Sequence, residues 1–358
     1  MSRLVPGPDW PFAPRRLPVF YGWVVLAVST LGILASVPGQ TMGMAAFTEP
    51  LMGALSLSRT ELSIAYMFGT IGSSLFLTRA GRLYDRIGGR ALIVLSSLAL
   101  GGAAVFIAGL ETLVTFLPAK LRGTGAFLLI LVGYLSVRFF GQGVLTSASR
   151  NILLGWFERR RGLVAGLRGI FVSLGFSLAP PLLAALVLAF GWRGALLVLA
   201  LVCGLAFAAL ALILARDAPE PCGLRPDGDA PPEPGEVPPP ITGASLDTAR
   251  RAPVFWIYAL GLAMHALFGT GLTFHVVSIF AEAGLEATQA FGYFLPVALV
   301  STSTNMFASW ASDRTALRPW LLVMLFAFLV ACLGLEQLST RTGYGLLVLG
   351  QGVGGGLW

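Results

Sequence analysis

The chain has 358 residues, of which 24 are Lys or Arg and 17 are Asp or Glu, so only 11% of its residues are charged. Soluble domains carry roughly 25% charged residues, and the mean hydropathy here is +0.81. This composition excludes a water-soluble globule and indicates an integral membrane protein whose main partner is the lipid bilayer.

The charged residues are grouped so that ten long segments contain none, namely 17–48, 62–78, 91–110, 123–137, 169–192, 194–215, 252–281, 287–312, 319–335 and 342–358. All but one reach or exceed the roughly 17 to 25 residues that a helix needs to cross a bilayer. Only 123–137 is shorter, and Arg138 alone interrupts its apolar run. None alternates as the strands of a membrane barrel do. We therefore predict an all-α polytopic fold with nine complete spans and a tenth that is shortened.

The basic residues are distributed unevenly between the two sides of the predicted membrane. With the N-terminus inside, 18 of the 24 Lys and Arg fall on the inner side, five fall on the outer side, and Arg138 lies within a span. Because cytoplasmic loops retain Lys and Arg, we predict a multi-pass protein of the inner or plasma membrane with a cytoplasmic N-terminus. The net charge of +7 then reflects topology, and no nucleic-acid partner is predicted.

A polar segment at 215–253 divides the chain, since it holds ten of the 22 prolines and too little apolar surface to fold. We predict a cytoplasmic tail (1–18), a six-helix N-terminal bundle (19–214), a flexible cytoplasmic linker (215–253) and a partial C-terminal bundle of helices 7 to 10 (254–358).

Sequence similarity between the two parts supports this division. Asp85, Arg86 and Arg90 recur 228 residues later as Asp313, Arg314 and Arg318, and the sequence Gly-Gln-Gly-Val at 141–144 recurs at 350–353. Such repeats are typical of transporters built from two parallel halves. If the second part had as many helices as the first, the whole protein would have about 420 residues and 12 helices, of which 9 to 10 are present here. A true ten-helix protein is the alternative.

The loop after the second span resembles a known family signature. Gly81, Leu83, Asp85, Arg86, Gly88 and Arg90 resemble the G-x-L-x-D-R-x-G-R-R loop of the major facilitator superfamily, with Gly89 in place of a basic residue. The segments FYGWVVLAVS (20–29) and WFERRRGLVAG (156–166) resemble the branch that contains monocarboxylate transporters and oxalate/formate antiporters.

The resemblance implies two six-helix halves that move around a midplane cavity. It also implies that the loop aspartate caps a helix of the other half when the inward gate is shut, while the glycine permits close helix packing. A gating role is therefore expected for Gly81, Asp85, Arg86, Gly88, Arg90, Asp313 and Arg314.

Arg138 is the single formal charge deep within a predicted span. Such a charge costs about 2.5 to 3.5 kcal/mol at the centre of a membrane helix, so something must compensate for it. Tyr134, Arg138 and Gln142 follow at intervals of four and would form one stripe of a helix. The stripe predicts a substrate-facing cationic site; the alternative is a structural arginine held by carbonyl oxygens or by a carboxylate on a neighbouring helix.

Further polar residues lie in helices that line the cavity in the superfamily. Gln40 in the first span and His265 in the seventh are candidate ligands, His275 is a second titratable group, and Asn305 in the eighth span is a supporting candidate. Histidine titrates near neutral pH, so protons are a candidate coupling ion. A hydrogen-bonded structural role is the alternative for each.

We therefore predict a secondary active transporter of a small organic anion, a mono- or dicarboxylate, working by alternating access. The alternatives are efflux of apolar, drug-like compounds, an integral-membrane enzyme, and a fragment without activity. An enzyme is not expected because the sequence lacks His-Glu-x-x-His, Gly-x-Ser-x-Gly and a membrane-embedded Asp pair. No cofactor is predicted, since the three cysteines form no paired motif.

Overall fold

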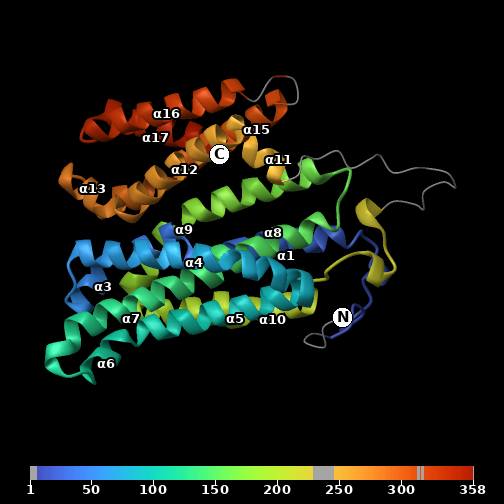
Figure 1. Cartoon of the computed structure of the whole chain (residues 1–358), viewed down its shortest axis with the longest axis horizontal. Helices are drawn as coiled ribbons and strands as arrows, with labels where there is room; N and C mark the ends of the chain where they lie inside the picture. The colour runs from blue at the N-terminus through green and yellow to red at the C-terminus, as the bar shows by residue number, and fades with distance from the viewer. Residues whose placement is uncertain (1–5, 229–245, 313–314, 316–317, 358) are drawn as a thin grey trace. The chain divides into compact units, whose positions relative to one another are not determined.

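The computed structural model describes residues 6–228, 246–312, 315 and 318–357 (Figure 1). All regular structure in these residues is helical, and all ten charge-free runs coincide with helices, which confirms the all-α polytopic prediction. The chain divides into two compact units, Met1–Asp229 and Ala230–Trp358, called the first and second unit below.

The described residues of the first unit, 6–228, form ten α-helices. They are α1 (Gly22–Ala35), α2 (Thr41–Ala45), α3 (Thr48–Leu55), α4 (Arg59–Ile87), α5 (Gly89–Ala108), α6 (Leu110–Thr115), α7 (Arg122–Val137), α8 (Thr146–Leu154), α9 (Arg161–Leu199) and α10 (Phe207–Leu214). π-Helical segments at Arg138–Leu145 and Ala200–Ala206 join α7 to α8 and α9 to α10. Gly191 interrupts α9 with a φ of 68°, which separates two of the predicted spans.

The second unit contains α11 (Leu246–Arg251), α12 (Pro253–Phe274), α13 (Val276–Glu282), α14 (Ala287–Gly292), α15 (Phe294–Ser312), α16 (Arg318–Glu336) and α17 (Arg341–Leu357). Its apolar core includes Leu272, Phe280, Tyr293 and Leu347. α17 packs against both α15 and α16.

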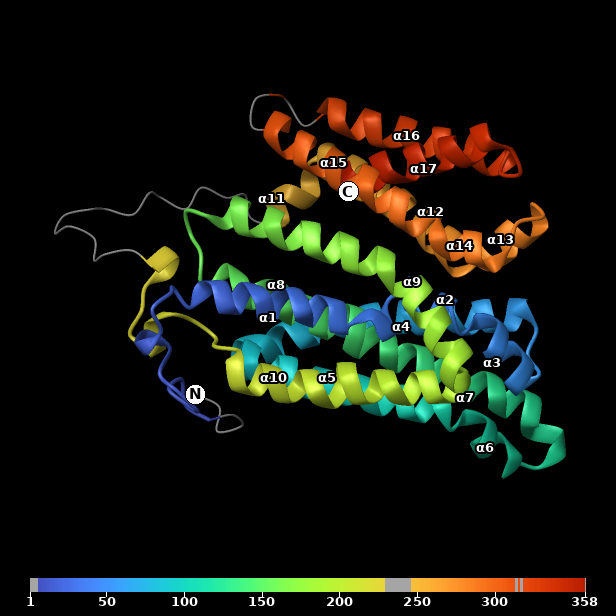
Figure 2. The same ribbon diagram turned by 180° about the vertical axis from the view of Figure 1, so that it is seen from behind.

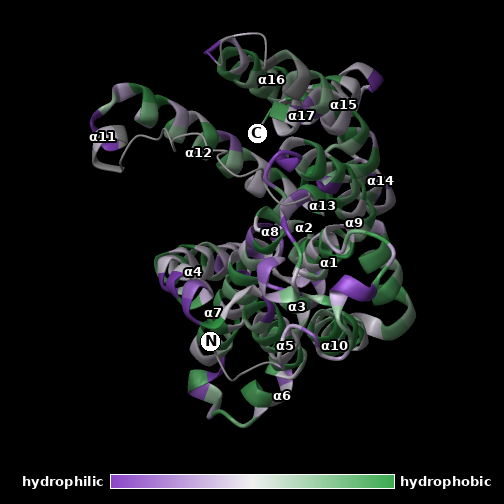
Figure 3. Cartoon of the chain, turned by 90° about the vertical axis from the view of Figure 1, so that its right-hand side faces the viewer, coloured by the Kyte–Doolittle hydropathy of each residue, from purple (hydrophilic) through white to green (hydrophobic). Residues whose placement is uncertain are grey.

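The surface of the helices is apolar, the reverse of a soluble fold. Leu188, Leu267 and Leu322 expose 90%, 76% and 68% of their surface, and hydrophobic colour runs along the helices in Figure 3. Five helical stretches in the described part of the chain are long and apolar enough to cross a membrane: Gly89–Ala108, Ala119–Leu154, Arg161–Leu214, Pro253–Phe274 and Arg318–Glu336. These apolar faces fit contact with lipid.

Glycines bring the spans of the first unit together. Gly39 lies against Gly141, so that a Cβ on Gly39 would be 2.8 Å from the Cα of Gly141. A Cβ on Gly101 of α5 would lie 2.9 Å from the Cα of Gly204, beside α10, and Figure 2 shows these two helices side by side. Small residues at such contacts allow backbones to approach closely.

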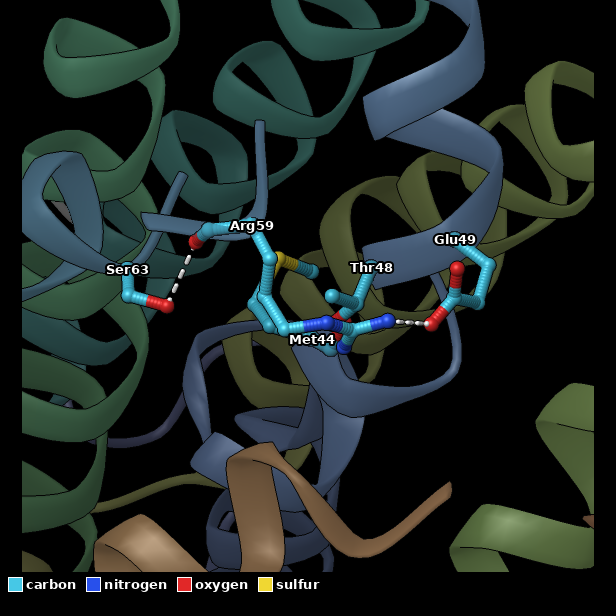
Figure 4. A network of polar contacts seen from close by, with 5 residues as sticks. All are labelled: Met44, Thr48, Glu49, Arg59 and Ser63. Atoms are coloured by element: carbon cyan, nitrogen blue, oxygen red, sulfur yellow. Dashed lines mark hydrogen bonds and ion pairs between the residues drawn. The ribbon is translucent and has the colours of Figure 1, made fainter. Parts of the chain in front are cut away.

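An ion pair joins α3 to the start of α4 (Figure 4). An Arg59 nitrogen lies 2.5 Å from an oxygen of Glu49 in α3, and the Ser63 hydroxyl donates to the carbonyl of Arg59 over 2.7 Å. Because these side chains are partly exposed, the ion pair orients the connection more than it stabilises it.

Residues 215–228 differ from the flexible segment expected at the start of the linker, because several hydrogen bonds hold them. Asp227 accepts from the backbone N–H groups of Glu158 and Arg159 over 2.8 Å and from that of Arg160 over 3.3 Å, while its own N–H donates to the carbonyl of Trp156. The segment thereby caps the start of α9 with a carboxylate, as helix N-termini favour.

This cap predicts a pH-dependent stability. Burial raises the pKa of the Asp227 carboxyl, but the three backbone N–H groups outweigh burial, and the pKa lies below its usual value. The stabilisation is therefore present above the unfolded pKa of about 3.9 and is lost as the pH falls through the lower folded pKa. Since Asp227→Asn removes only the charge at the helix N-terminus, we expect it to lower the free energy of unfolding in detergent by about 0.3 to 1 kcal/mol at pH 7.

The difference between the two proteins should shrink as the pH is lowered below 4, which denaturation curves at several pH values would measure. Asp85→Asn, at an exposed position, serves as the control. A constant difference across this range would contradict the assignment.

Candidate functional site

The membrane-embedded Arg138 is buried, with 5% of its surface exposed. Its Nη1 donates to the carbonyl oxygen of Gly39 over 3.3 Å and to the Thr41 hydroxyl over 3.4 Å, and its guanidinium lies 5.2 Å from the centre of the Tyr66 ring. No Asp or Glu oxygen among the described residues lies within ion-pair distance, and Nε is buried without a hydrogen-bond partner there. The charge is thus only partly compensated.

One tyrosine, Tyr66, lies beside this guanidinium, and a second, Tyr134, packs against the first. Tyr134 is fully buried, and its hydroxyl has no hydrogen-bond partner among the described residues. Its ring meets the ring of Tyr66 edge to face at 5.2 Å, and the Tyr66 hydroxyl donates to Thr41 over 2.9 Å. Arg138, Tyr134, Tyr66 and Thr41, called the arginine cluster below, therefore join α7, α4 and α2.

Gln142 differs in burial from the other two residues of the expected stripe. Arg138–Leu145 is a π-helical segment, whose hydrogen bonds reach one residue further than those of an α-helix. Within it Gln142 is exposed, whereas Tyr134 and Arg138 are buried.

Gln40 belongs to a separate buried network. Its Nε2 donates to the Ser36 hydroxyl over 2.8 Å and lies 3.3 Å from the Thr146 hydroxyl, and these two hydroxyls are 3.0 Å apart. Ser36 and Thr146 satisfy its amide nitrogen, so this network ties the first span to the fourth beside the arginine cluster.

The polar candidates of the second unit lie where α12 and α15 face the last turns of α17. His265 is buried, and a Cβ on Gly354 would lie 2.9 Å from its ring. The Asn305 side chain donates to the Gly356 carbonyl over 3.0 Å. His275 instead terminates α12, with its ring 5.1 Å from that of Phe274.

The expected gating residues differ in how far they are exposed. Gly88 joins α4 to α5 with a φ of 87° and a ψ of 161°, which only glycine adopts without strain. Gly81, Asp85 and Arg86 are exposed, whereas Arg90 is buried. Asp313 and Arg314 lie outside the described residues.

A cavity of about 200 Å³ lies near this loop and not at the arginine cluster. It is lined by Leu77, Ala80, Gly81, Tyr84, Leu92, Val144, Ser147, Ala148 and Asn151.

Sequence analysis did not single out Tyr66 and Thr41, although both contact the arginine. The available signal was weak, because a tyrosine and a threonine in apolar runs are common. Only the packing of α2 and α4 against the fourth span brings them to Arg138.

Comparisons with known proteins agree with this architecture. The model of the major facilitator superfamily matches residues 16–358. A bacterial homolog of the human lysosomal transporter Spinster is similar in its inward-facing unoccupied form, with 17% identity over 94% of this chain and 73% of that chain and a TM-score of 0.66. Its inward-facing occupied form is similar with 18% identity over 94% of this chain and 73% of that chain and a TM-score of 0.63.

A D-xylose–proton symporter is similar over 94% of this chain and 81% of that chain, with 14% identity and a TM-score of 0.60. No curated protein matches the sequence. At these identities the solved structures show the fold, while the family match extends from the tail to the last residue. The chain therefore belongs to the major facilitator superfamily and is a multi-pass membrane transporter rather than an enzyme.

Proposed function

We propose that this transporter carries a small organic anion, a mono- or dicarboxylate, and that Arg138 binds its carboxylate. The observation that carries the proposal is a buried guanidinium without a carboxylate partner among the described residues. A buried charge is costly unless it is paired, and a substrate carboxylate would pair with it. The resemblance to the monocarboxylate and oxalate/formate branch supports the same substrate class.

The hydrogen bonds that Arg138 makes are long, so a substrate carboxylate would replace them with shorter ones. Its two hydrogen bonds measure 3.3 and 3.4 Å, whereas charge-assisted bonds between guanidinium and carboxylate measure about 2.7 to 2.9 Å. An incoming carboxylate would form shorter bonds and would use the Nε donor that has no partner among the described residues. Tyr134, with its hydroxyl equally unpaired there, would donate to the same anion.

The remaining residues complete the proposal. We propose substrate-orienting roles for Gln142 and Gln40 of the first unit. His265, Asn305 and His275 of the second unit are further candidates for binding substrate or protons, with protons as the coupling ion. Gly81, Asp85, Arg86, Gly88, Arg90, Asp313 and Arg314 would serve gating. The proposal also includes a location in the inner or plasma membrane with a cytoplasmic N-terminus. It further includes the division into tail, bundle, linker and second bundle, with boundaries after residues 18, 214 and 253.

A second candidate function is the efflux of apolar compounds with Arg138 in a structural role. The bond from Nη1 to the Gly39 carbonyl favours it, because a main-chain oxygen is a typical partner of a structural arginine.

The test is uptake of labelled oxalate, lactate and succinate into vesicles that contain the purified protein. For at least one of these anions we expect Arg138→Ala to lower uptake at limiting substrate by 100-fold or more. Arg138→Lys should recover little of it, since lysine lacks the planar fork that binds a carboxylate bidentately. The carboxylate should also raise the melting temperature of the wild-type protein but not that of Arg138→Ala.

Arg79→Ala is the matched control, because Arg79 is an exposed arginine in the same unit whose guanidinium stacks on Phe76. It should retain uptake. If Arg138→Ala folds and still takes up the carboxylate like the wild type, the anion site is wrong and the structural role is favoured.

A further inference from the structure

The N-terminal segment Pro6–Phe12 crosses one end of the first unit and is held there by two arginines. Arg90 Nη1 donates to the carbonyls of Pro6 and Gly7 over 3.0 and 3.2 Å, and its Nη2 donates to that of Trp10 over 3.1 Å. Arg90, near the start of α5, therefore binds the main chain of this segment.

The second arginine, Arg216, binds other main-chain carbonyls of the same segment. Its Nε donates to the carbonyl of Pro8 over 2.6 Å, and its Nη2 donates to that of Trp10 over 2.6 Å and lies 3.5 Å from that of Phe12. Its guanidinium also lies 5.4 Å from the centre of the Phe12 ring. Arg90 and Arg216 expose 2% and 1% of their surface.

Both arginines also bind the end of α10, whose last carbonyls have no partner within the helix. Arg90 Nε donates to the carbonyl of Leu212 over 3.0 Å, and Arg216 Nη1 donates to those of Ile213 and Ala215 over 2.7 and 2.8 Å. Each guanidinium therefore connects the tail segment to the end of the sixth span.

Asp217, the residue after Arg216, connects the chain that follows α10 to the start of α5. An Asp217 oxygen accepts from the backbone N–H of Arg90 over 2.6 Å, so the chain leaving α10 caps the start of α5. The indole of Trp156 donates to the Arg216 carbonyl over 2.9 Å. The tail segment, the start of α5 and the end of α10 thus meet at these two guanidinium groups, and Figures 1 and 2 show the dark-blue start of the described chain near the ends of α5 and α10.

The tail segment is bound as a separate peptide would be. It donates none of these bonds, and its carbonyls accept from arginine side chains that belong to other elements. Two prolines within Pro6–Pro8 restrict its backbone, so little conformational entropy is lost on binding. Trp10 exposes 44% of its surface; the outer side of the segment is uncovered.

We propose that residues 6–12 form a detachable strap that holds the third and sixth spans together at the end of the unit where the chain leaves toward the second unit. Release of the strap leaves the two arginines short of their tail acceptors and loosens the start of α5, the end of α10 and residues 215–228. This device does not depend on the identity of the substrate.

Hydrogen–deuterium exchange on the purified protein in nanodiscs tests the strap. Removal of residues 1–12 should speed exchange at least tenfold in peptides that cover 89–95 and 208–228, while α12 and α16 remain unchanged. A synthetic peptide of residues 2–17, added in excess, should restore slow exchange. Arg90→Gln, with the tail intact, should reproduce the faster exchange, and the peptide should not reverse it.

Arg16→Ala is the matched control, since Arg16 is an exposed arginine on the same tail outside the strap; its exchange should equal that of the wild type. Unchanged exchange after removal of the tail would overturn the proposal. Faster exchange throughout the first unit that the peptide cannot restore would also overturn it, because the tail would then be an inseparable part of the core.

Discussion

Replacing Gly39 by alanine is expected to destabilise the first unit strongly and to abolish transport. A Cβ at this position would lie 2.2 Å from the carbonyl oxygen of Val137 and 2.8 Å from both the amide nitrogen of Gln142 and the Cα of Gly141. All three are backbone atoms, so no side chain can move aside, and the first and fourth spans must separate. We expect a loss of about 3 kcal/mol, at the upper end of overpacking costs.

The same change displaces the candidate substrate site, because the Gly39 carbonyl accepts from Arg138. The measurements are the midpoint of thermal unfolding in detergent, followed by tryptophan fluorescence, and uptake of the labelled carboxylate. Gly53→Ala is the control, since nothing lies within 4 Å of a Cβ at Gly53. An unfolding midpoint like that of the wild type would show that the two spans do not approach as closely as described.

Replacing Gly350 by valine should disrupt the second unit in the same way. Even the first carbon of a side chain there would lie 2.4 Å from the amide nitrogen of Ala331 and 2.5 Å from the carbonyl oxygen of Ala327. Because α16 and α17 pack along each other, we expect a loss of about 3 kcal/mol and fast proteolysis within 318–357.

Limited proteolysis with mass spectrometry measures this effect, and fragments from the first unit should keep their wild-type resistance. Gly345→Val on the same helix is the control, because a Cβ at Gly345 meets no atom within 4 Å. Resistance of the Gly350 variant equal to that of this control would contradict the packing of α16 on α17.

Close helix contacts at Gly141 and Gly350 give a physical reason for glycine in both copies of Gly-Gln-Gly-Val. Gly141 lies against the first and third spans, where a Cβ would meet Gly39 and Leu100, and Gly350 lies against the ninth span. The first glycine of each copy therefore stands at a close helix contact. The glutamines differ, since Gln142 is exposed and Gln351 is half-buried.

The sequence by itself determined the class of protein and the positions of its helices. A bilayer cannot satisfy backbone hydrogen bonds, so each apolar run must form a helix, and the gaps between charged residues mark those runs. The loop from Gly81 to Arg90 was specific enough to identify the superfamily, because its residues occur at fixed spacing after the second span. The cost of a buried charge likewise singled out Arg138.

Only the tertiary structure decided what surrounds these residues. Spacing by four assumes a regular α-helix, so it anticipated neither the π-helical segment Arg138–Leu145 nor the exposure of Gln142. Arg90 and Arg216 appeared as ordinary charges at the ends of spans, yet each binds carbonyls of the tail from positions 80 or more residues away. Such contacts depend on how distant segments pack, and local periodicity carries no information about them.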